Sequence, residues 1–559
     1  MAESDPSAAD RGAQDPAAQD PGAQDPGGQD PGGQDPGGQR PEVGGPYARY
    51  VLFVLVLVYV FNFIDRQILS ILAEEIKADL GLDDAQIGFL YGTAFAVFYA
   101  VFGIPLGRLA DVWVRRSVIS MGLFFWSGMT ALSGTARSFF SLAGYRIGVG
   151  VGEASASPAA FSMLSDYFPP RLRATAVGIY SSGVYIGAGV GLLIGGQVVD
   201  RWNAAYPGGG PFGLVGWQAA FFVVGLPGLL MAIWVRTLKE PIRGMAEGLP
   251  EPRPHPAPFG ALGKELMAVL PPFTLISLGV AGGTRVVVMN LVGAAVIAGI
   301  SWALVVLVGP VPQWVALGIG VYCAFSWAQG LALRDRPAFE LIFKTKSMVL
   351  GVIGFASISF VGYGFGFWIP PFFIREHGIS AGTAGTILGV LAAIGGWLGV
   401  TTGGIVSDKL KQRSPRGRMV VGLFAAVFAV PAAFVVVGAS NLTLAYAGTF
   451  LFHVFSSCWV GPGATTPNDL VLPRMRGAAS AFYLLMVTFI GLALGPFTIG
   501  KLSDVFARGG ADPSDALRSA MLASLFIFLL TGVALIAAGR YVGEEERTRV
   551  ERARAVGEA

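Results

Sequence analysis

Long apolar runs recur along this chain, and they restrict what it can fold into. Stretches such as "VLFVLVLVYVF" (51–61) extend into segments of about twenty residues, the length that a helix needs to cross a bilayer. Only 13% of the 559 residues are charged, whereas a soluble protein carries about a quarter. The sequence therefore predicts an all-α polytopic membrane protein.

The apolar runs group as six, two and six predicted spans. The first six cover 50–72, 86–107, 117–136, 139–168, 174–199 and 217–236. Two more cover 286–308 and 314–333, and the last six cover 347–374, 383–407, 419–439, 442–471, 478–502 and 516–541. The prediction is fourteen membrane-spanning helices.

Basic residues fall in alternate loops between these spans. Arg115 and Arg116 follow the second span, Arg171 and Arg173 follow the fourth, and 409–418 follows the tenth with five basic residues. Loops with an excess of Lys and Arg stay in the cytoplasm. We therefore expect both termini in the cytoplasm.

Composition divides the chain into six parts. Residues 1–46 contain a repeat of the type "AQDPG", which has no apolar face to bury and is expected to be disordered. Bundles at 47–240 and 341–543 flank a linker (241–285) and an inserted helix pair (286–340), and 544–559 form a charged tail. Within the linker, Pro271 and Pro272 interrupt an apolar stretch at 264–283, which we expect to lie at the membrane surface.

The two bundles repeat one another in sequence. "PPRLRATAVGIY" (169–180) has a counterpart in "LPRMRGAASAFY" (472–483). Asp200 lies 27 residues after Arg173, and Asp504 lies 28 residues after Arg476. Internal repeats of this kind are typical of secondary transporters. The chain is thus predicted to fold as two pseudo-symmetric six-helix bundles with two inserted transmembrane helices.

Two motifs carry a resemblance to a known family. "GRLADVWVRR" (107–116) resembles the cytoplasmic loop motif of the major facilitator superfamily. "YRIGVGVGEASASPAAFSMLSDYFPPRLRATAVGIY" (145–180), with "NFIDRQILS" (62–70), resembles the spinster-like branch of that superfamily.

The resemblance implies a secondary carrier that works by alternating access and is not an enzyme. Its implied substrates are lysolipid-like amphiphiles or other small organic solutes, and its implied coupling is to protons. An uncoupled facilitator, a drug efflux carrier and a non-transporting membrane sensor remain open as alternatives. We expect a monomer in a cell membrane, such as a bacterial inner membrane, with the lipid bilayer as its surroundings and no nucleic-acid partner.

Four ionisable residues lie within the predicted spans of the first bundle. Asp65 and Arg66 stand side by side in the first span, while Arg146 and Glu153 lie in the fourth. By depth, Arg146 is level with the Asp–Arg pair, and Glu153 lies about 10 Å further in. Charges at such depth are costly unless they face a partner or water, and ionisable residues found there usually have a function, so we expect a role in proton coupling or substrate binding. A static ion-pair network that only fixes helix packing is the alternative.

Several residues outside this group of four are assigned candidate roles. His453 in the twelfth span is a candidate for substrate or proton binding, or simply a core histidine. The superfamily resemblance implies that Asp111, Arg115 and Arg116, with Asp408 as a weaker copy, gate the cytoplasmic side. Trp368 is expected in the outer aromatic belt, ahead of the alternative that it lines the transport cavity from the second bundle. Three scattered histidines and two cysteines give no metal cluster, and no cofactor is expected.

Glycines recur every four residues in the fifth span. Gly183, Gly187, Gly191 and Gly195 share one helix face, which would let a second helix approach closely. Packing within one molecule is the favoured interpretation, ahead of dimerisation.

Overall fold

The computed structural model describes residues 43–247 and 255–558, and every regular element within these ranges is a helix. Twelve of its helical segments are long and apolar enough to cross a membrane. The predicted all-α membrane fold is therefore confirmed. Residues 1–42 of the predicted tail lie outside the described ranges.

The first bundle contains helices α1 to α8. Their bounds are α1 Pro46–Leu80, α2 Asp84–Tyr91, α3 Thr93–Val112, α4 Arg115–Ser133, α5 Phe139–Glu153, α6 Ala156–Tyr167, α7 Pro170–Ala205 and α8 Gly216–Arg236, with a short turn η1 Pro211–Gly213. Two predicted spans, 117–136 and 139–168, correspond to α4 and to the α5–α6 pair. Helix α4 and the α5–α6 pair are rich in Ser and Gly and are not among the twelve apolar segments. The count of fourteen spans therefore stays a prediction.

The second bundle repeats this order. Its helices are α13 Lys346–His377, α14 Ala381–Arg413, α15 Gly417–Gly438, α16 Leu442–Ser457, α17 Val460–Asp469, α18 Arg476–Met486, the π-helical segment η4 Val487–Ala493, α19 Leu494–Arg508, α20 Pro513–Ser524 and α21 Ile527–Arg547. The fourth predicted membrane span of each bundle is broken into two helices, α5 and α6 in the first bundle and α16 and α17 in the second. This shared interruption agrees with the internal repeat of the sequence.

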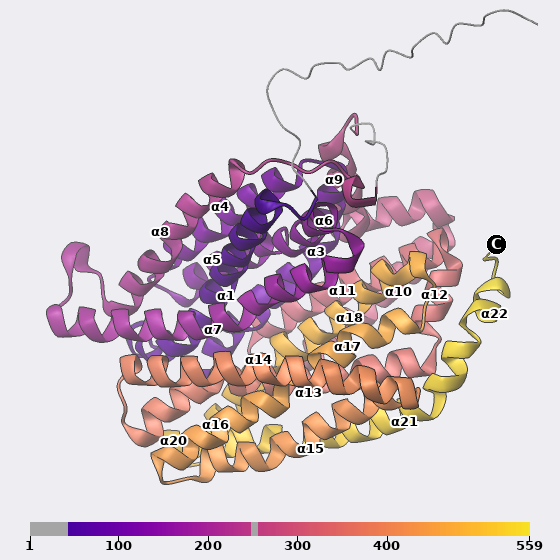
Figure 1. Cartoon of the computed structure of the whole chain (residues 1–559). Coiled ribbons are helices and arrows are strands. Elements are labelled where there is room, and N and C mark those ends of the chain that lie inside the picture. The colour runs from indigo at the N-terminus through magenta and orange to yellow at the C-terminus, as the bar shows by residue number, and fades with distance from the viewer. Residues whose placement is uncertain (1–42, 248–254, 559) are drawn as a thin grey trace, which may run out of the picture. The chain divides into compact units, whose positions relative to one another are not determined.

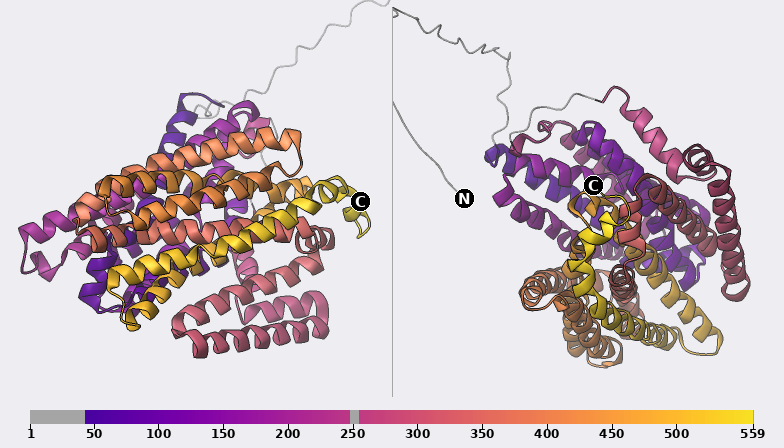
Figure 2. Two further views of the ribbon diagram at one scale, coloured as in Figure 1. Left: turned by 90° about the horizontal axis from the view of Figure 1, so that it is seen from below. Right: turned by 90° about the vertical axis from the view of Figure 1, so that its right-hand side faces the viewer.

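The segment between the bundles is divided differently from the prediction. After η2 Met245–Glu247, helix α9 runs from Pro258 to Val269, and α10 (Phe273–Val308) begins thirteen residues before the predicted span. Gly283 has φ 71°, which bends α10 without ending it. Helices α11 (Val311–Arg334) and α12 (Arg336–Phe343) complete the insert. Figure 2 shows α10 and α11 as a hairpin at the edge of the bundles.

The charged C-terminal tail packs against the insert and the second bundle. Helix α22 covers Arg549–Arg554, and Arg474 pairs with both Asp335 and Glu558. Burial acts to raise the pKa of Asp335, but the Arg474 guanidinium and the Ala338 N–H outweigh it and hold that pKa below its ordinary value. The tail is thus tied to the start of α12.

Helix α7 packs closely on two neighbouring helices, because glycines line two of its faces. A Cβ at Gly187 would lie 2.5 Å from the Val60 carbonyl oxygen of α1, and a Cβ at Gly189 would lie 2.5 Å from the Gly389 carbonyl oxygen of α14. The predicted glycine spacing therefore packs α7 on α1 within one molecule. Figure 1 shows α7 and α14 running side by side between the bundles.

This packing predicts that Gly187→Leu destabilises the protein. The new side chain would collide with α1 backbone, and overpacking of this kind costs about 1–3 kcal/mol. Gly178→Leu on the same helix is the control, because a Cβ there meets nothing within 4 Å. Thermal unfolding of the purified protein should show a lower midpoint for Gly187→Leu alone. Equal midpoints for the two variants would contradict the close α1–α7 contact.

Candidate functional site

A buried ion pair joins α1 to the end of α5. The Arg66 Nη2 donates to Glu153 Oε2 at 2.8 Å, and the residues are 6% and 0% exposed. Glu153 is the last residue of α5, where the rod breaks before α6. Asn62, one turn before Arg66, adds a weak contact at 3.5 Å. Residue counting placed Arg146 level with Arg66 and Glu153 about 10 Å further in, whereas in the structure it is Glu153 that pairs with Arg66.

Asp65 and Arg146 complete this charge cluster, which we define as Asp65, Arg66, Arg146 and Glu153. Asp65 is fully buried, but Arg146 Nη1 donates to its backbone carbonyl at 3.1 Å and not to its carboxylate. Within the described residues both Asp65 carboxylate oxygens lack a hydrogen-bond partner. The Trp126 indole N–H and the Thr130 hydroxyl of α4 lie beside that carboxylate without completing a hydrogen bond.

Three aromatic rings surround the Arg66 guanidinium. Its central carbon lies 4.6 Å from the ring centre of Phe63, 4.4 Å from Phe95 and 5.1 Å from Tyr99. Such rings stabilise a cation that has lost its water. The two guanidiniums and two carboxylates balance formally, yet within the described part of the chain Glu153 has a cationic partner and Asp65 has none. The two carboxyl groups therefore sit in different chemical settings.

Two other predicted residues lie apart from the charge cluster. His453 is on α16 against Gly395 of α14, and no hydrogen bond or ion pair among the described residues joins it to the cluster. The placement of Trp368 in an outer belt is wrong. Its side chain is fully buried, and its indole N–H donates to the Pro496 carbonyl at 2.8 Å.

The predicted gate residues do not meet across the bundles. Asp111 is exposed and lies 4.0 Å from Arg108 of its own helix, while Asp408 is exposed on α14. Arg115 is buried and pairs with Asp166 and Glu240, and Arg116 binds the Leu238 carbonyl. All of these partners belong to the first bundle or to its junction with the linker.

The bundles are joined by ion pairs at the opposite end, which sequence reasoning missed. We call it the locked end; it carries Glu74, Asp84, Asp200, Arg375 and Asp504. Arg375 of α13 pairs with Glu74 and Asp84 at 2.7 Å each. Among the described residues, every ion pair between the two bundles lies here. The other end, where α1 and α13 begin and α21 ends, is called the termini end.

Two repeat-related aspartates strengthen the locked end. Asp504 of α19 accepts from the backbone N–H of Asp84 and Ala85, at 3.0 and 2.9 Å, at the start of α2. Asp200 of α7 accepts from Gly382 N–H at 2.9 Å, at the start of α14. The first N–H groups of a helix lack internal partners and favour a nearby anion. Each bundle thus supplies one aspartate to a helix start of the other.

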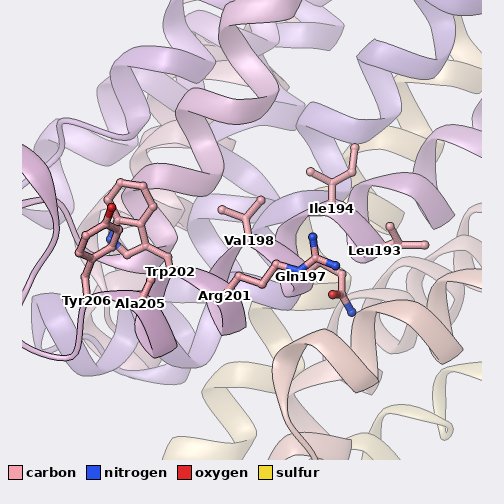
Figure 3. A pocket seen from close by; sticks show the side chains of 8 residues that line it. All are labelled: Leu193, Ile194, Gln197, Val198, Arg201, Trp202, Ala205 and Tyr206. Atoms are coloured by element: carbon pink, nitrogen blue, oxygen red, sulfur yellow. The ribbon is translucent and has the colours of Figure 1, made fainter.

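A pocket of about 430 Å³ lies along α7 near the locked end. Figure 3 shows its lining, which includes Arg201 beside Gln197, and Trp202 beside Tyr206. Gln197 also donates to the Gly382 carbonyl at 3.2 Å and to Thr386 at 3.0 Å. None of the predicted site residues lines this pocket.

Comparison with known proteins settles the family. The family model described as Major Facilitator Superfamily matches residues 55–496. The chain belongs to the major facilitator superfamily. It is accordingly a multi-pass membrane transporter and not an enzyme, as the sequence predicts.

Several relatives within the superfamily match most of the chain. A Mycolicibacterium smegmatis "MFS-type efflux pump" is 26% identical over 87% of this chain and 90% of its own length. "Protein spinster homolog 1" of Xenopus tropicalis is 24% identical over 91% of this chain and 84% of its own. A crystal structure of a bacterial homologue of the human lysosomal transporter Spinster, in an inward-facing and occupied conformation, is similar at TM-score 0.65 and 26% identity, covering 90% of this chain and 98% of that one. The resemblance to the spinster-like branch is thereby confirmed.

Proposed function

We propose that this chain is a proton-coupled secondary carrier of a lysolipid-like amphiphilic solute. The observation that carries the proposal is the charge cluster, four ionisable side chains buried between α1, α4 and α5. Ionisable groups held at such depth mark substrate or proton pathways more often than they fix packing.

In the proposed transport cycle the Arg66 guanidinium binds Glu153 and the anionic headgroup of the solute in turn. In the structure the guanidinium is occupied by Glu153. Protonation of Glu153 would remove its negative charge and free the guanidinium for an anionic headgroup. Loss of the proton would restore the ion pair and expel the anion. Asp65, whose carboxylate has no partner within the described residues, is the second proton site of this proposal.

The locked end fits the outer gate of an alternating-access cycle. With the termini in the cytoplasm, as the basic loops predict, the locked end faces outward and the conformation is inward-facing. The similar Spinster homologue was solved in that conformation. Asp111, Arg115, Arg116 and Asp408 would then gate the cytoplasmic side when the bundles rock to the opposite state.

The relatives favour the spinster-like branch over sugar-acid transporters, and an amphiphilic solute is what the spinster-like resemblance implies. Spinster homologues match the chain along about nine-tenths of its length, whereas "Probable galactarate/D-glucarate transporter GudP" matches 34% of it at 32% identity in Bacillus subtilis and 66% of it at 26% identity in Escherichia coli. The efflux-pump relative keeps outward transport of hydrophobic drugs as a second candidate. We place the protein in a cell membrane as a monomer.

Uptake into proteoliposomes tests the proposal. Purified protein is reconstituted and offered a labelled lysophospholipid, D-glucarate and ethidium in turn, with protein-free vesicles as the control. We expect saturable movement of the lysophospholipid. Movement of ethidium or D-glucarate alone would overturn the substrate class, and a lysophospholipid that shifts thermal unfolding without crossing the membrane would favour the sensor alternative.

A further inference from the structure

An apolar cavity of about 550 Å³ lies between the inserted hairpin and the second bundle. Its walls come from α10, α11 and α12 of the insert and from α18 and η4 of the second bundle, with Trp327, Phe343, Phe482 and Phe489 among the lining side chains. Almost every other lining residue is also apolar. A cavity with such walls, beside a hairpin whose α10 is largely exposed, suits a hydrocarbon chain.

One polar side chain breaks the apolar lining. Gln329 of α11 lines the cavity and is only 7% exposed, and its Nε2 has no hydrogen-bond partner within the described residues. Its Oε1 is already used by Asn290 Nδ2 at 2.6 Å, and Asn290 is held in turn by Ser326 and Tyr322. The network leaves Gln329 Nε2 as an unpaired donor just beneath the cavity wall, and an acceptor oxygen of an occupant would satisfy it once the amide turns toward the cavity.

Basic residues flank the same end of the cavity. Arg334 follows the lining residue Leu333, Arg285 precedes the lining residue Val286, and Arg336 starts α12. All three are exposed and form no ion pair with the described part of the chain. Gln329 lies five residues from Arg334, or about 7.5 Å along the helix. That offset matches an anionic headgroup at the arginines and an ester carbonyl at the amide.

We propose that this cavity binds an anionic phospholipid of the surrounding bilayer, with one acyl chain inside it. The ester carbonyl would accept from Gln329 Nε2, and the phosphate would lie among Arg285, Arg334 and Arg336. The arrangement supplies an apolar cavity, a buried donor and a cationic rim in the order in which a phospholipid presents its parts. The proposal is independent of the solute that is transported.

The bound lipid would stabilise the contacts that the inserted hairpin makes with both bundles. Helix α11 reaches α3 of the first bundle, where Thr93 donates to Gln313 at 2.7 Å, and α12 packs on the second bundle, where the rings of Phe343 and Phe482 are 4.9 Å apart. A lipid seated between hairpin and α18 would therefore favour the conformation in which these contacts coexist.

Fluorescence quenching of Trp327 tests the site. Full-length protein is placed in phosphatidylcholine vesicles that contain phosphatidylglycerol with brominated acyl chains, and the Trp327 signal is the difference between wild type and Trp327→Phe. We expect quenching at a lower mole fraction than with brominated phosphatidylcholine. Each of Arg285→Gln, Arg334→Gln and Arg336→Gln should weaken this preference about fivefold, while Arg540→Gln, an exposed arginine of α21, should not. Equal quenching by the two lipids would overturn the proposal.

Lipid retention gives a second readout. Native mass spectrometry should find fewer retained phosphatidylglycerol molecules on Ala328→Phe, which fills the cavity, and on Gln329→Leu, which removes its donor. Val296→Phe, at an exposed position of α10 outside the lining, is the matched control. Retention that is unchanged in both cavity variants, with thermal unfolding like that of wild type, would show ordinary bilayer contact and refute the site.

Discussion

Replacing both Arg66 and Glu153 by methionine is expected to give a folded protein that no longer transports. A buried ion pair can be replaced by apolar residues of similar volume with little loss of stability. Glu153→Met alone should be much worse, because it leaves the Arg66 guanidinium buried without its partner, at a cost of about 3–5 kcal/mol. The two variants therefore separate the structural contribution of the pair from its role in transport.

Thermal unfolding and proteoliposome uptake together measure this difference. The double variant should unfold near the wild-type temperature and take up lysophospholipid no faster than protein-free vesicles. Arg518→Met with Glu376→Met is the matched control, because that pair lies within the second bundle at the locked end and should be dispensable. Uptake at the wild-type rate by the Arg66–Glu153 double variant would show that this ion pair only fixes helix packing and has no role in transport.

Arg375→Gln is expected to release the locked end. Arg375 is the cation that joins Glu74 and Asp84 of the first bundle to α13. Its loss leaves the largely buried Asp84 with fewer partners, and breaking a buried pair costs about 3 kcal/mol or more. A difference of that size shifts a two-state equilibrium about a hundredfold toward the state open at this end.

Distances between spin labels report this shift. One pair of labels at Ala204 and Ser440 spans the bundles at the locked end, and another at Arg171 and Gln412 spans them at the termini end; all four positions are exposed or lie at helix ends. Cys323 and Cys458 are first replaced by serine. In Arg375→Gln the first distance should lengthen and the second shorten. Arg518→Gln, an arginine whose partners lie in its own bundle, should leave both unchanged.

Helix periodicity made part of this site predictable from the sequence. The spacing of Gly183 to Gly195 predicted a closely packed face of α7. Counting residues along the first and fourth spans gathered the four charges in neighbouring spans, but it placed Glu153 about 10 Å further in than Arg66, with which it pairs in the structure. The glycine face needs only a regular helix, whereas the pairing of Arg66 with Glu153 depends on how α1 packs on α5. The internal repeat likewise located Asp200 and Asp504, although not what they bind.

Contacts between distant segments were not predictable. Arg375 and Asp84 are 291 residues apart, and only the packing of the two bundles brings them together. Trp368 was misplaced because a tryptophan near the end of a span has the same sequence pattern whether it faces lipid or a neighbouring helix. Trp126 and Thr130 were missed because α4 carries no charge near them, and only the fold turns that face toward Asp65.

Proton movement driven by solute tests the central claim most directly. Proteoliposomes that contain a pH-sensitive dye and wild-type, Asp65→Asn or Glu153→Gln protein are given a lysophospholipid gradient without an imposed pH gradient. Wild type should change the internal pH as the solute crosses, whereas Glu153→Gln should exchange labelled for unlabelled solute without a pH change, and Asp65→Asn should show a smaller pH change than wild type. Solute flux through wild type with a constant internal pH would contradict proton coupling by the buried charges.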